Sequence, residues 1–181
     1  MEIIVQFDGL EKKKHAFLHT VSSWTPCQLR FRPTPAAWSA LQVLDHVVKT
    51  EREIFAAAQS GLNQSRTSPL GDRIRGSLLN ALMSSPARLK VPAAAALILP
   101  DNSKDLPELT DDWISVRRLQ RKWIAALGSG YSNKGIFRHP VSGWMTPSQT
   151  LGFLSAHLHH HGFQIKRIQR DPAWVRTKAT G

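Results

Sequence analysis

The sequence contains one cysteine, Cys27, so it cannot form an internal disulfide, and a zinc site built from several cysteines is excluded. It contains no stretch of eighteen apolar residues, which predicts that no helix spans a membrane. The apolar run near the N-terminus, in MEIIVQFDGLEKKK, is too short for a signal peptide. Internal repeats and low-complexity tracts are also absent. We therefore expect a cytoplasmic protein without membrane contact.

The 181 residues suit one domain with a core of its own, which we expect to span residues 1–181. Within it the sequence predicts a helical bundle over about 3–170 and a loose tail over about 173–181. The net charge of +11 permits nucleic-acid binding. However, the basic residues are spread over the polar faces of predicted helices, and no helix-turn-helix or other recognition motif occurs. A solvated surface is the better interpretation, and nucleic-acid binding is the least favoured function.

Apolar residues recur with helical spacing in four segments. The last of these has the clearest start, because Thr146 can cap a helix, Pro147 suits its first turn, and Gln149 follows at the capping-box position. The predicted helices cover residues 3–21, 35–60, 110–127 and 146–168.

The second and third predicted helices are joined by residues 61–107, a stretch interrupted by prolines and glycines. It is too long for a plain turn, and connections of this length are often functional. We expect a short helix over residues 72–83 and irregular chain over 91–99. Residues 131–144 are expected to be a loop, and no strand pair is evident. The sequence therefore predicts an all-α fold, a four-helix bundle with a long crossover between helices two and three.

Four of the eight histidines lie on the last predicted helix. At about 100° per residue, His161 lies roughly 40° round the helix from His157, and Gln164 roughly 20° to the other side. These three side chains should point inward, whereas His159 points to solvent and His160 lies on the flank. Two histidines four residues apart can bind one metal ion, because they meet over one helical turn. A pair of hydrogen-bonded, partly buried histidines explains the pattern equally well.

Two other groups of histidines need separate interpretation. His15 and His19 also stand four apart, but no third residue on the first helix matches them, so we expect both at the surface. His46 lies beside the apolar stripe of the second helix, on a face that carries polar residues. We therefore expect His46 on the wall of a polar cleft or exposed, rather than deeply buried.

Several motifs follow one another in an order that extends over nearly the whole chain. They are Leu29-Arg30-Phe31-Arg32-Pro33, Trp38-Ser39, Leu44-Asp45-His46, the segment HPVSGWMT from His139, and the segment HLHHHGFQI from His157. This ordered set resembles the DinB-like (damage-inducible) family of four-helix metalloproteins. The resemblance implies a bundle with a crossed connection and a divalent metal ion bound by His46, His157 and His161. His159 and His160 are not in matching positions.

Three neutral imidazoles suit zinc, nickel or iron(II), and we favour zinc or nickel. Three protein ligands leave a coordination position open, which is typical of catalytic zinc sites. Water bound there could reach a pKa near 7, or a thiol could bind as thiolate. Glu53, about 20° round the helix from His46, is the candidate base or carboxylate beside a ligand. Gln164 could orient a ligand or a substrate, or be a buried amide bonded to a backbone carbonyl.

The branches that this chain resembles include S-transferases that use bacillithiol or mycothiol. The leading hypothesis is therefore a metal-dependent enzyme that attacks a small-molecule electrophile with a low-molecular-weight thiol, and the first alternative is a metal-dependent hydrolase. A second alternative is a non-catalytic metal-binding or stress-response module that acts as a homodimer. Trp144 and Trp174, outside the principal helices, could serve its interface, although such tryptophans are more often core or lid residues.

Overall fold

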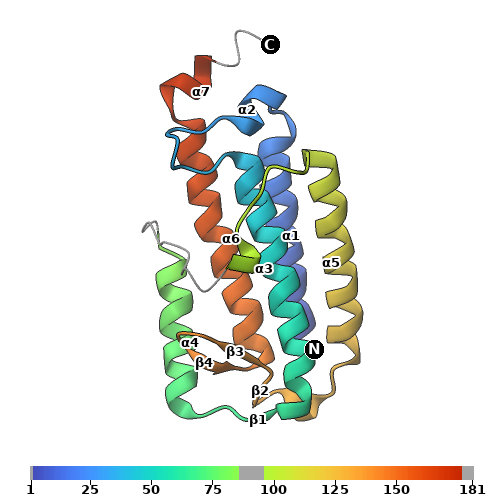
Figure 1. Ribbon diagram of the computed structural model, residues 1–181. Coiled ribbons are helices and arrows are strands. Elements are labelled where there is room, and N and C mark those ends of the chain that lie inside the picture. Colours follow the sequence, from blue (N-terminus) through green and yellow to red (C-terminus); the bar gives the residue numbers. More distant parts are fainter. Residues whose placement is uncertain (1, 86–95, 177–181) are drawn as a thin grey trace.

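Four long helices form a bundle in the computed structural model, which describes residues 2–85 and 96–176 (Figure 1). α1 and α6 run in one direction, and α3 and α5 run in the other. Each parallel pair packs side by side, and α6 also packs antiparallel against α3. The predicted all-α bundle with a long crossover between its second and third helices is confirmed. The four helices are α1 (Glu2–Ser22), α3 (Ala40–Gly61), α5 (Leu106–Ala126) and α6 (Pro147–Gln169).

Capping boxes set the starts of three of these helices. The side chains of Ser39, Asp105 and Thr146 each accept a hydrogen bond from the amide three residues on, and the side chain at that position accepts one in return. The second predicted helix therefore begins at Ala40 rather than at residue 35. The third begins at Leu106 rather than at residue 110, because its box lies one turn earlier than the start we expected.

Four short strands form although no strand pair is evident from the sequence, and they correct the expectation that residues 131–144 are a loop. β1 (Arg66–Thr67) pairs with β2 (Lys134–Gly135), and β3 (Phe137–His139) pairs with β4 (Gly143–Met145), both antiparallel. A tertiary contact stabilises the β3–β4 hairpin, because the Asp72 carboxylate accepts a hydrogen bond of 2.8 Å from the Trp144 amide. Strands of two or three residues are too short for an alternating pattern to reveal them.

The crossover contains the predicted short helix, α4 (Leu70–Met83), which packs along α6. Residues 86–95 of the crossover, including most of the expected irregular segment, lie outside the described residues. The chain resumes in a 3₁₀ turn, η2 (Ala96–Ile98), packed against α3. The remaining short elements are α2 (Pro26–Arg30), η1 (Leu62–Gln64), η3 (Ser129–Tyr131) and α7 (Pro172–Arg176).

α7 corrects part of the predicted loose tail. Its Trp174 is buried and packs edge-on against Trp24, with ring centroids 4.6 Å apart. Of the two roles considered for Trp174, a place in the core and a place at an interface, the structure gives the core. Residues 177–181 of the tail lie outside the described residues.

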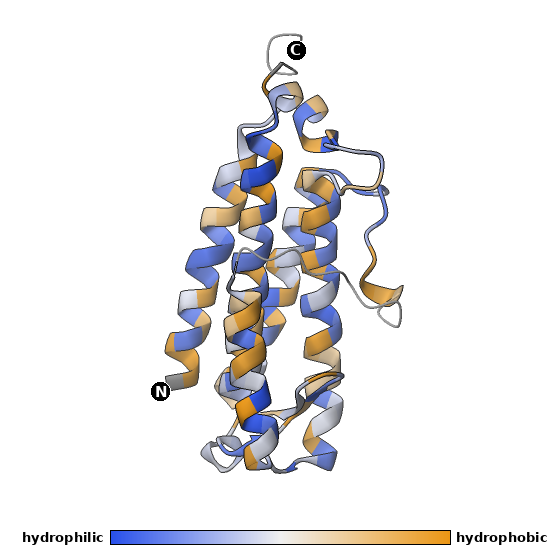
Figure 2. Ribbon diagram, turned by 90° about the vertical axis from the view of Figure 1, so that its left-hand side faces the viewer, coloured by the Kyte–Doolittle hydropathy of each residue, from blue (hydrophilic) through white to orange (hydrophobic). Residues whose placement is uncertain are grey.

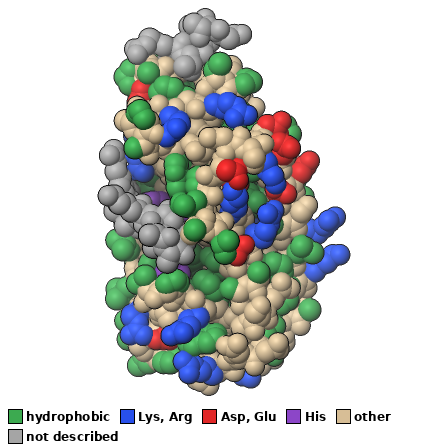
Figure 3. Space-filling view, in the orientation of Figure 1, with side chains coloured by type: hydrophobic (Ala, Val, Ile, Leu, Met, Phe, Trp, Pro, Cys, Tyr) green, Lys and Arg blue, Asp and Glu red, His purple; other side chains and the backbone are tan. Residues whose placement is uncertain are grey.

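The core lies between the apolar sides of the helices, and Figure 2 shows hydrophobic and hydrophilic residues sharing each long helix. A buried ion pair joins α3 to α5 within it: Arg117 contacts both carboxylate oxygens of Glu51 at 2.6 Å. Trp113 donates a further hydrogen bond of 2.9 Å to Glu51. No helix in the described part of the chain combines the length and the apolar character needed to cross a bilayer. On the face shown in Figure 3, lysines and arginines lie in separate groups rather than in one band.

Candidate metal centre

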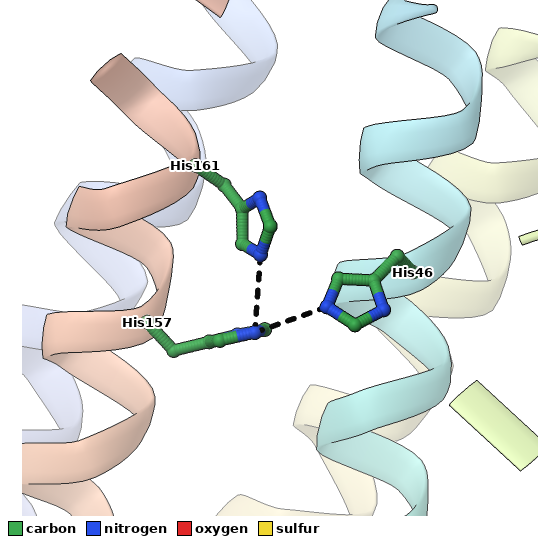
Figure 4. A group of neighbouring side chains, drawn as sticks. All are labelled: His46, His157 and His161. Atoms are coloured by element: carbon green, nitrogen blue, oxygen red, sulfur yellow. Dashed lines mark hydrogen bonds between the residues drawn. The ribbon is translucent and has the colours of Figure 1, made fainter. Parts of the chain in front are cut away.

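Two helices bring three histidines together in the middle of the bundle. His46 comes from α3, and His157 and His161 come from successive turns of α6 (Figure 4). All three are buried, with exposed fractions of 2% for His46 and 5% for the other two. The burial of His46 corrects the expectation of a cleft wall or an exposed position. α6 packs against α3 at this point. The pattern of residues along α3 does not show which helix will lie beside it, so the sequence did not predict that His46 is buried.

The imidazole nitrogens of the three histidines are spaced as one bound ion would require. The Nε2 atom of His157 lies 3.2 Å from Nε2 of His46 and 3.1 Å from Nε2 of His161. One nitrogen from each side chain lies within 4.8 Å of the others. Two nitrogens bound to a tetrahedral zinc at about 2.0–2.1 Å would be about 3.3 Å apart. The residues present therefore fit a metal ion with little movement.

Hydrogen bonds on the outer nitrogens point the inner ones at the centre. Nδ1 of His46 lies 2.7 Å from the backbone oxygen of Ile98, and Nδ1 of His161 lies 2.9 Å from Oε1 of Gln164. Both partners are acceptors, so each Nδ1 carries the proton and donates. The Nε2 lone pairs of His46 and His161 are then free to face inward, as in metal sites whose ligands are oriented by a second hydrogen bond.

Burial keeps these histidines neutral. Desolvation lowers the pKa of His157 well below its ordinary value and lowers the pKa of His161 to about 3. For His46, desolvation lowers the pKa and outweighs the opposing effect of the hydrogen bond to Ile98. A neutral imidazole is the form that binds a metal ion. At neutral pH each of the three imidazoles is therefore in the uncharged form that a metal ion needs.

Aromatic rings surround the three histidines. Trp38 lies with its ring centroid 4.9 Å from that of His46 and stacks on His161 at 6.5 Å. Phe153 stacks on His157 at 5.8 Å. These rings limit the access of water to the cluster, and an apolar surrounding strengthens electrostatic interactions with a bound ion.

Two further histidines lie near the three. His160 is buried, its ring centroid is 5.3 Å from that of His161, and its Nδ1 has no hydrogen-bond partner among the described residues. His139 lies at the end of β3, where Nδ1 accepts a hydrogen bond of 3.1 Å from the Val141 amide. Its ring centroid is 5.0 Å from that of Phe153. The sequence predicted His160 on the flank of the last helix. His139 was not among the candidate ligands, but it begins the HPVSGWMT segment that leads into that helix.

Of the remaining candidate residues, four are exposed and one, Gln164, contacts a histidine of the site. His15, His19 and His159 are exposed, as predicted. Glu53 is exposed as well, and within the described residues no hydrogen bond or ion pair joins it to the three histidines. The angle between Glu53 and His46 on the helix is small, but seven residues correspond to about 10.5 Å along the axis. Gln164, by contrast, contacts His161 directly through its side chain.

Comparison with known proteins agrees with this architecture. The chain belongs to the DinB superfamily, whose family model matches residues 10–165. Among solved structures it is similar to YfiT from Bacillus subtilis, described as "a probable metal-dependent hydrolase with an unusual four-helix bundle topology". The TM-score is 0.60 and the sequence identity is 20%, over 95% of this chain and 88% of that chain, which shows a shared fold. No curated protein matches the sequence.

Proposed function

We propose that this protein is a metal-dependent enzyme in which His46, His157 and His161 bind one divalent ion, and that hydrolysis is its leading reaction. One observation carries the proposal: three buried imidazoles converge through Nε2, with spacings of 3.1 and 3.2 Å between neighbouring nitrogens. Histidines with only a packing role would not need all three Nε2 atoms directed at one point.

The donor set favours zinc, nickel or iron(II). When bound by three protein ligands, such an ion keeps an open position and acidifies a water molecule or a thiol there. The chain's own groups would supply orientation and shielding. Ile98 and Gln164 hold the ligand rings through their outer nitrogens, and Trp38 and Phe153 offer an apolar wall to a substrate.

Hydrolysis is preferred to thiol transfer for two reasons. The similar structure YfiT is described as a probable metal-dependent hydrolase, and no thiol-binding motif is identifiable in this sequence. Transfer of a low-molecular-weight thiol to an electrophile is the second candidate, because the same open coordination position serves a thiolate. Both reactions need the same three histidines, so the metal site can be tested before the substrate is known.

The first test is the metal content of the purified untagged protein, measured by plasma mass spectrometry after reconstitution with zinc or nickel. We expect about one ion per chain in the wild type and a loss of the ion in His46→Ala, His157→Ala and His161→Ala. His159→Ala removes an exposed histidine from the same helix and should keep the ion. A wild-type protein that binds no ion, or a His159→Ala variant that loses it equally, would overturn the proposed site.

The second test separates the two reactions in the metal-loaded protein. We expect turnover of activated esters or amides without added thiol, abolished in His157→Ala and retained in His159→Ala. Turnover of a haloaromatic electrophile only when a thiol is added would instead favour the transferase. Metal binding without either reaction would favour the non-catalytic metal-binding module.

A further inference from the structure

The end of the crossover is bound to α3 directly beside the metal centre. η2 packs against α3 (Figure 1), and its last residue, Ile98, accepts the Nδ1 hydrogen bond of His46 at 2.7 Å. One orienting hydrogen bond of the centre thus comes from a segment 52 residues away in the chain. The position of this segment therefore affects the direction of the Nε2 lone pair of His46.

Lys49 links this segment to α3 through hydrogen bonds and ion pairs. Its Nζ atom donates to the carboxylates of Asp45 at 2.8 Å and Asp101 at 2.9 Å, and to the backbone oxygen of Leu99 at 3.2 Å. Asp45 also accepts a hydrogen bond of 2.9 Å from the Asp101 amide. We call these three side chains, Asp45, Lys49 and Asp101, the crossover clamp.

The crossover clamp and His46 hold the same short piece of chain. Asp45 immediately precedes His46, and Lys49 follows one turn later. Their partners are Leu99 and Asp101, next to the Ile98 carbonyl that His46 contacts. Because the Asp45 and Lys49 side chains are only 8% and 24% exposed, their ion pair is less screened by solvent than a fully exposed one.

We propose that the crossover clamp positions the Ile98 carbonyl on His46 and thereby sets the affinity of the three histidines for their metal ion. The inference rests on the proposed function, since it presumes that the histidines bind a metal. Without the clamp, the Ile98 carbonyl can move away, and the His46 ring can then rotate or change its tautomer. Rotation turns the Nε2 lone pair away from the centre, and the change of tautomer replaces that lone pair with an N–H group. Partners of this kind typically account for a 10–100-fold difference in metal affinity.

The coupling must also act in the opposite direction. If a fixed crossover favours metal binding, a bound metal favours the fixed crossover by the same factor, because binding free energies are linked. Metal binding should therefore protect the backbone of residues 96–101 from hydrogen exchange. This effect does not depend on catalysis or on knowing the substrate.

The test compares Lys49→Met with Lys104→Met. Lys104 is also partly exposed and also paired with a carboxylate, that of Asp112, but among the described residues no hydrogen bond or ion pair joins its side chain to the crossover clamp or the histidines. Both variants remove one positive charge and keep most of the apolar stem. Asp101→Asn is a milder second variant, because it weakens the clamp at an exposed position. Circular dichroism checks that each variant is folded.

Zinc affinity is measured by competition with a chromophoric chelator, and hydrogen exchange of the 96–101 peptide is measured with and without zinc. We expect Lys49→Met to bind zinc about 10–100-fold more weakly than wild type, Asp101→Asn to be intermediate, and Lys104→Met to match wild type. Zinc should slow exchange of the 96–101 peptide in wild type and slow it less in Lys49→Met. Equal zinc affinity of the two lysine variants, or hydrogen exchange that zinc does not affect, would contradict the proposed role of the crossover clamp. Neither result would contradict the proposed metal site. Absence of zinc binding in wild type would overturn both.

Discussion

The side-chain oxygen of Gln164 lies 2.9 Å from Nδ1 of His161, one helical turn away on α6. Because this oxygen can only accept, it holds the His161 proton on Nδ1 and leaves Nε2 free to bind a metal ion. Gln164 is half-buried, so its replacement should not disrupt the core. This contact gives Gln164 a measurable role in positioning His161.

We expect Gln164→Ala to weaken metal binding by roughly tenfold or more, because the His161 ring loses its orienting partner. Gln164→Glu keeps an acceptor at the same place and should retain the affinity. Gln169→Ala, an exposed change at the end of the same helix, is the control. Competition with a chelator provides the measurement, and unchanged affinity in Gln164→Ala would show that the contact does not orient His161.

The buried histidines predict how the stability of the metal-free protein depends on pH. Burial lowers the pKa of His157 and brings that of His161 to about 3, whereas an unfolded histidine titrates near 6.5. Between these values the unfolded chain binds protons that the folded chain does not. The free energy of unfolding should therefore fall as the pH is lowered through about 6.5, by at most about 1.4 kcal/mol per pH unit for each histidine.

Urea unfolding at several pH values between about 7.5 and 5 would measure this slope, since the histidine effect lies in that range. His161→Gln should show a shallower slope than wild type. The control His15→Gln changes an exposed histidine and should keep the wild-type slope. Identical slopes in all three proteins would contradict the predicted effect of burial.

Gly61 allows the β2–β3 segment to approach the end of α3. A β-carbon at this position would lie 1.9 Å from the backbone oxygen of Ile136, so the backbone itself would have to move. We expect Gly61→Ala to destabilise the protein by about 2 kcal/mol or more, as overpacking does. Gly9→Ala has open space around it and should instead stabilise α1 by up to about 1 kcal/mol. Thermal unfolding of both variants tests the pair, and equal effects would refute the explanation.

We expect the loss of one partner from the buried Glu51–Arg117 pair to destabilise the protein much more than the same loss from an exposed pair. Arg117→Met leaves a buried carboxylate without its cation and should cost about 3–5 kcal/mol in the free energy of unfolding. The exposed pair of Arg121 and Asp8 is a control, because Arg121→Ala should cost less than about 1 kcal/mol. Urea unfolding measures both. A loss for Arg117→Met as small as that for Arg121→Ala would show that the buried pair contributes little.

The expected homodimer stays a prediction, and α4 offers a place to test it. Leu70, Ile74, Leu78 and Leu82 are 50–70% exposed and stand four residues apart, so they form one ridge of α4. Because the four residues are evenly spaced, the ridge has the same pattern from either end of α4. Two copies related by a twofold axis could therefore pair through it. We expect sedimentation to show a dimer that Leu78→Glu dissociates. Leu119→Glu, exposed on α5, should leave it intact, and a monomeric wild type would contradict the expectation.

Features that depend on neighbours within one helix could be predicted from the sequence. The relation of His157, His161 and Gln164 is one of these, because residues three, four and seven positions apart share a face of a helix. The exposure of His159 follows from the same geometry. The cap of α6 was also predictable, since Thr146 and Gln149 make a local motif.

Features that depend on contacts between distant segments were missed or wrong. The burial of His46 and its contact with Ile98 depend on α6 and the crossover, both remote in sequence. The short strands and the packing of Trp174 on Trp24 likewise involve partners that no local pattern identifies.

The sequence by itself determined the helices, the cap that begins α6 and the pair of histidines on α6, because each of these depends on residues within a few positions of one another. Only the tertiary structure decided which residues complete the site. α3 brings His46 to within 3.2 Å of His157, a residue 111 positions away, and the crossover supplies Ile98 to orient it. The physical reason is that helix periodicity is a local property, whereas the packing of α3, α6 and the crossover depends on burying their apolar sides together.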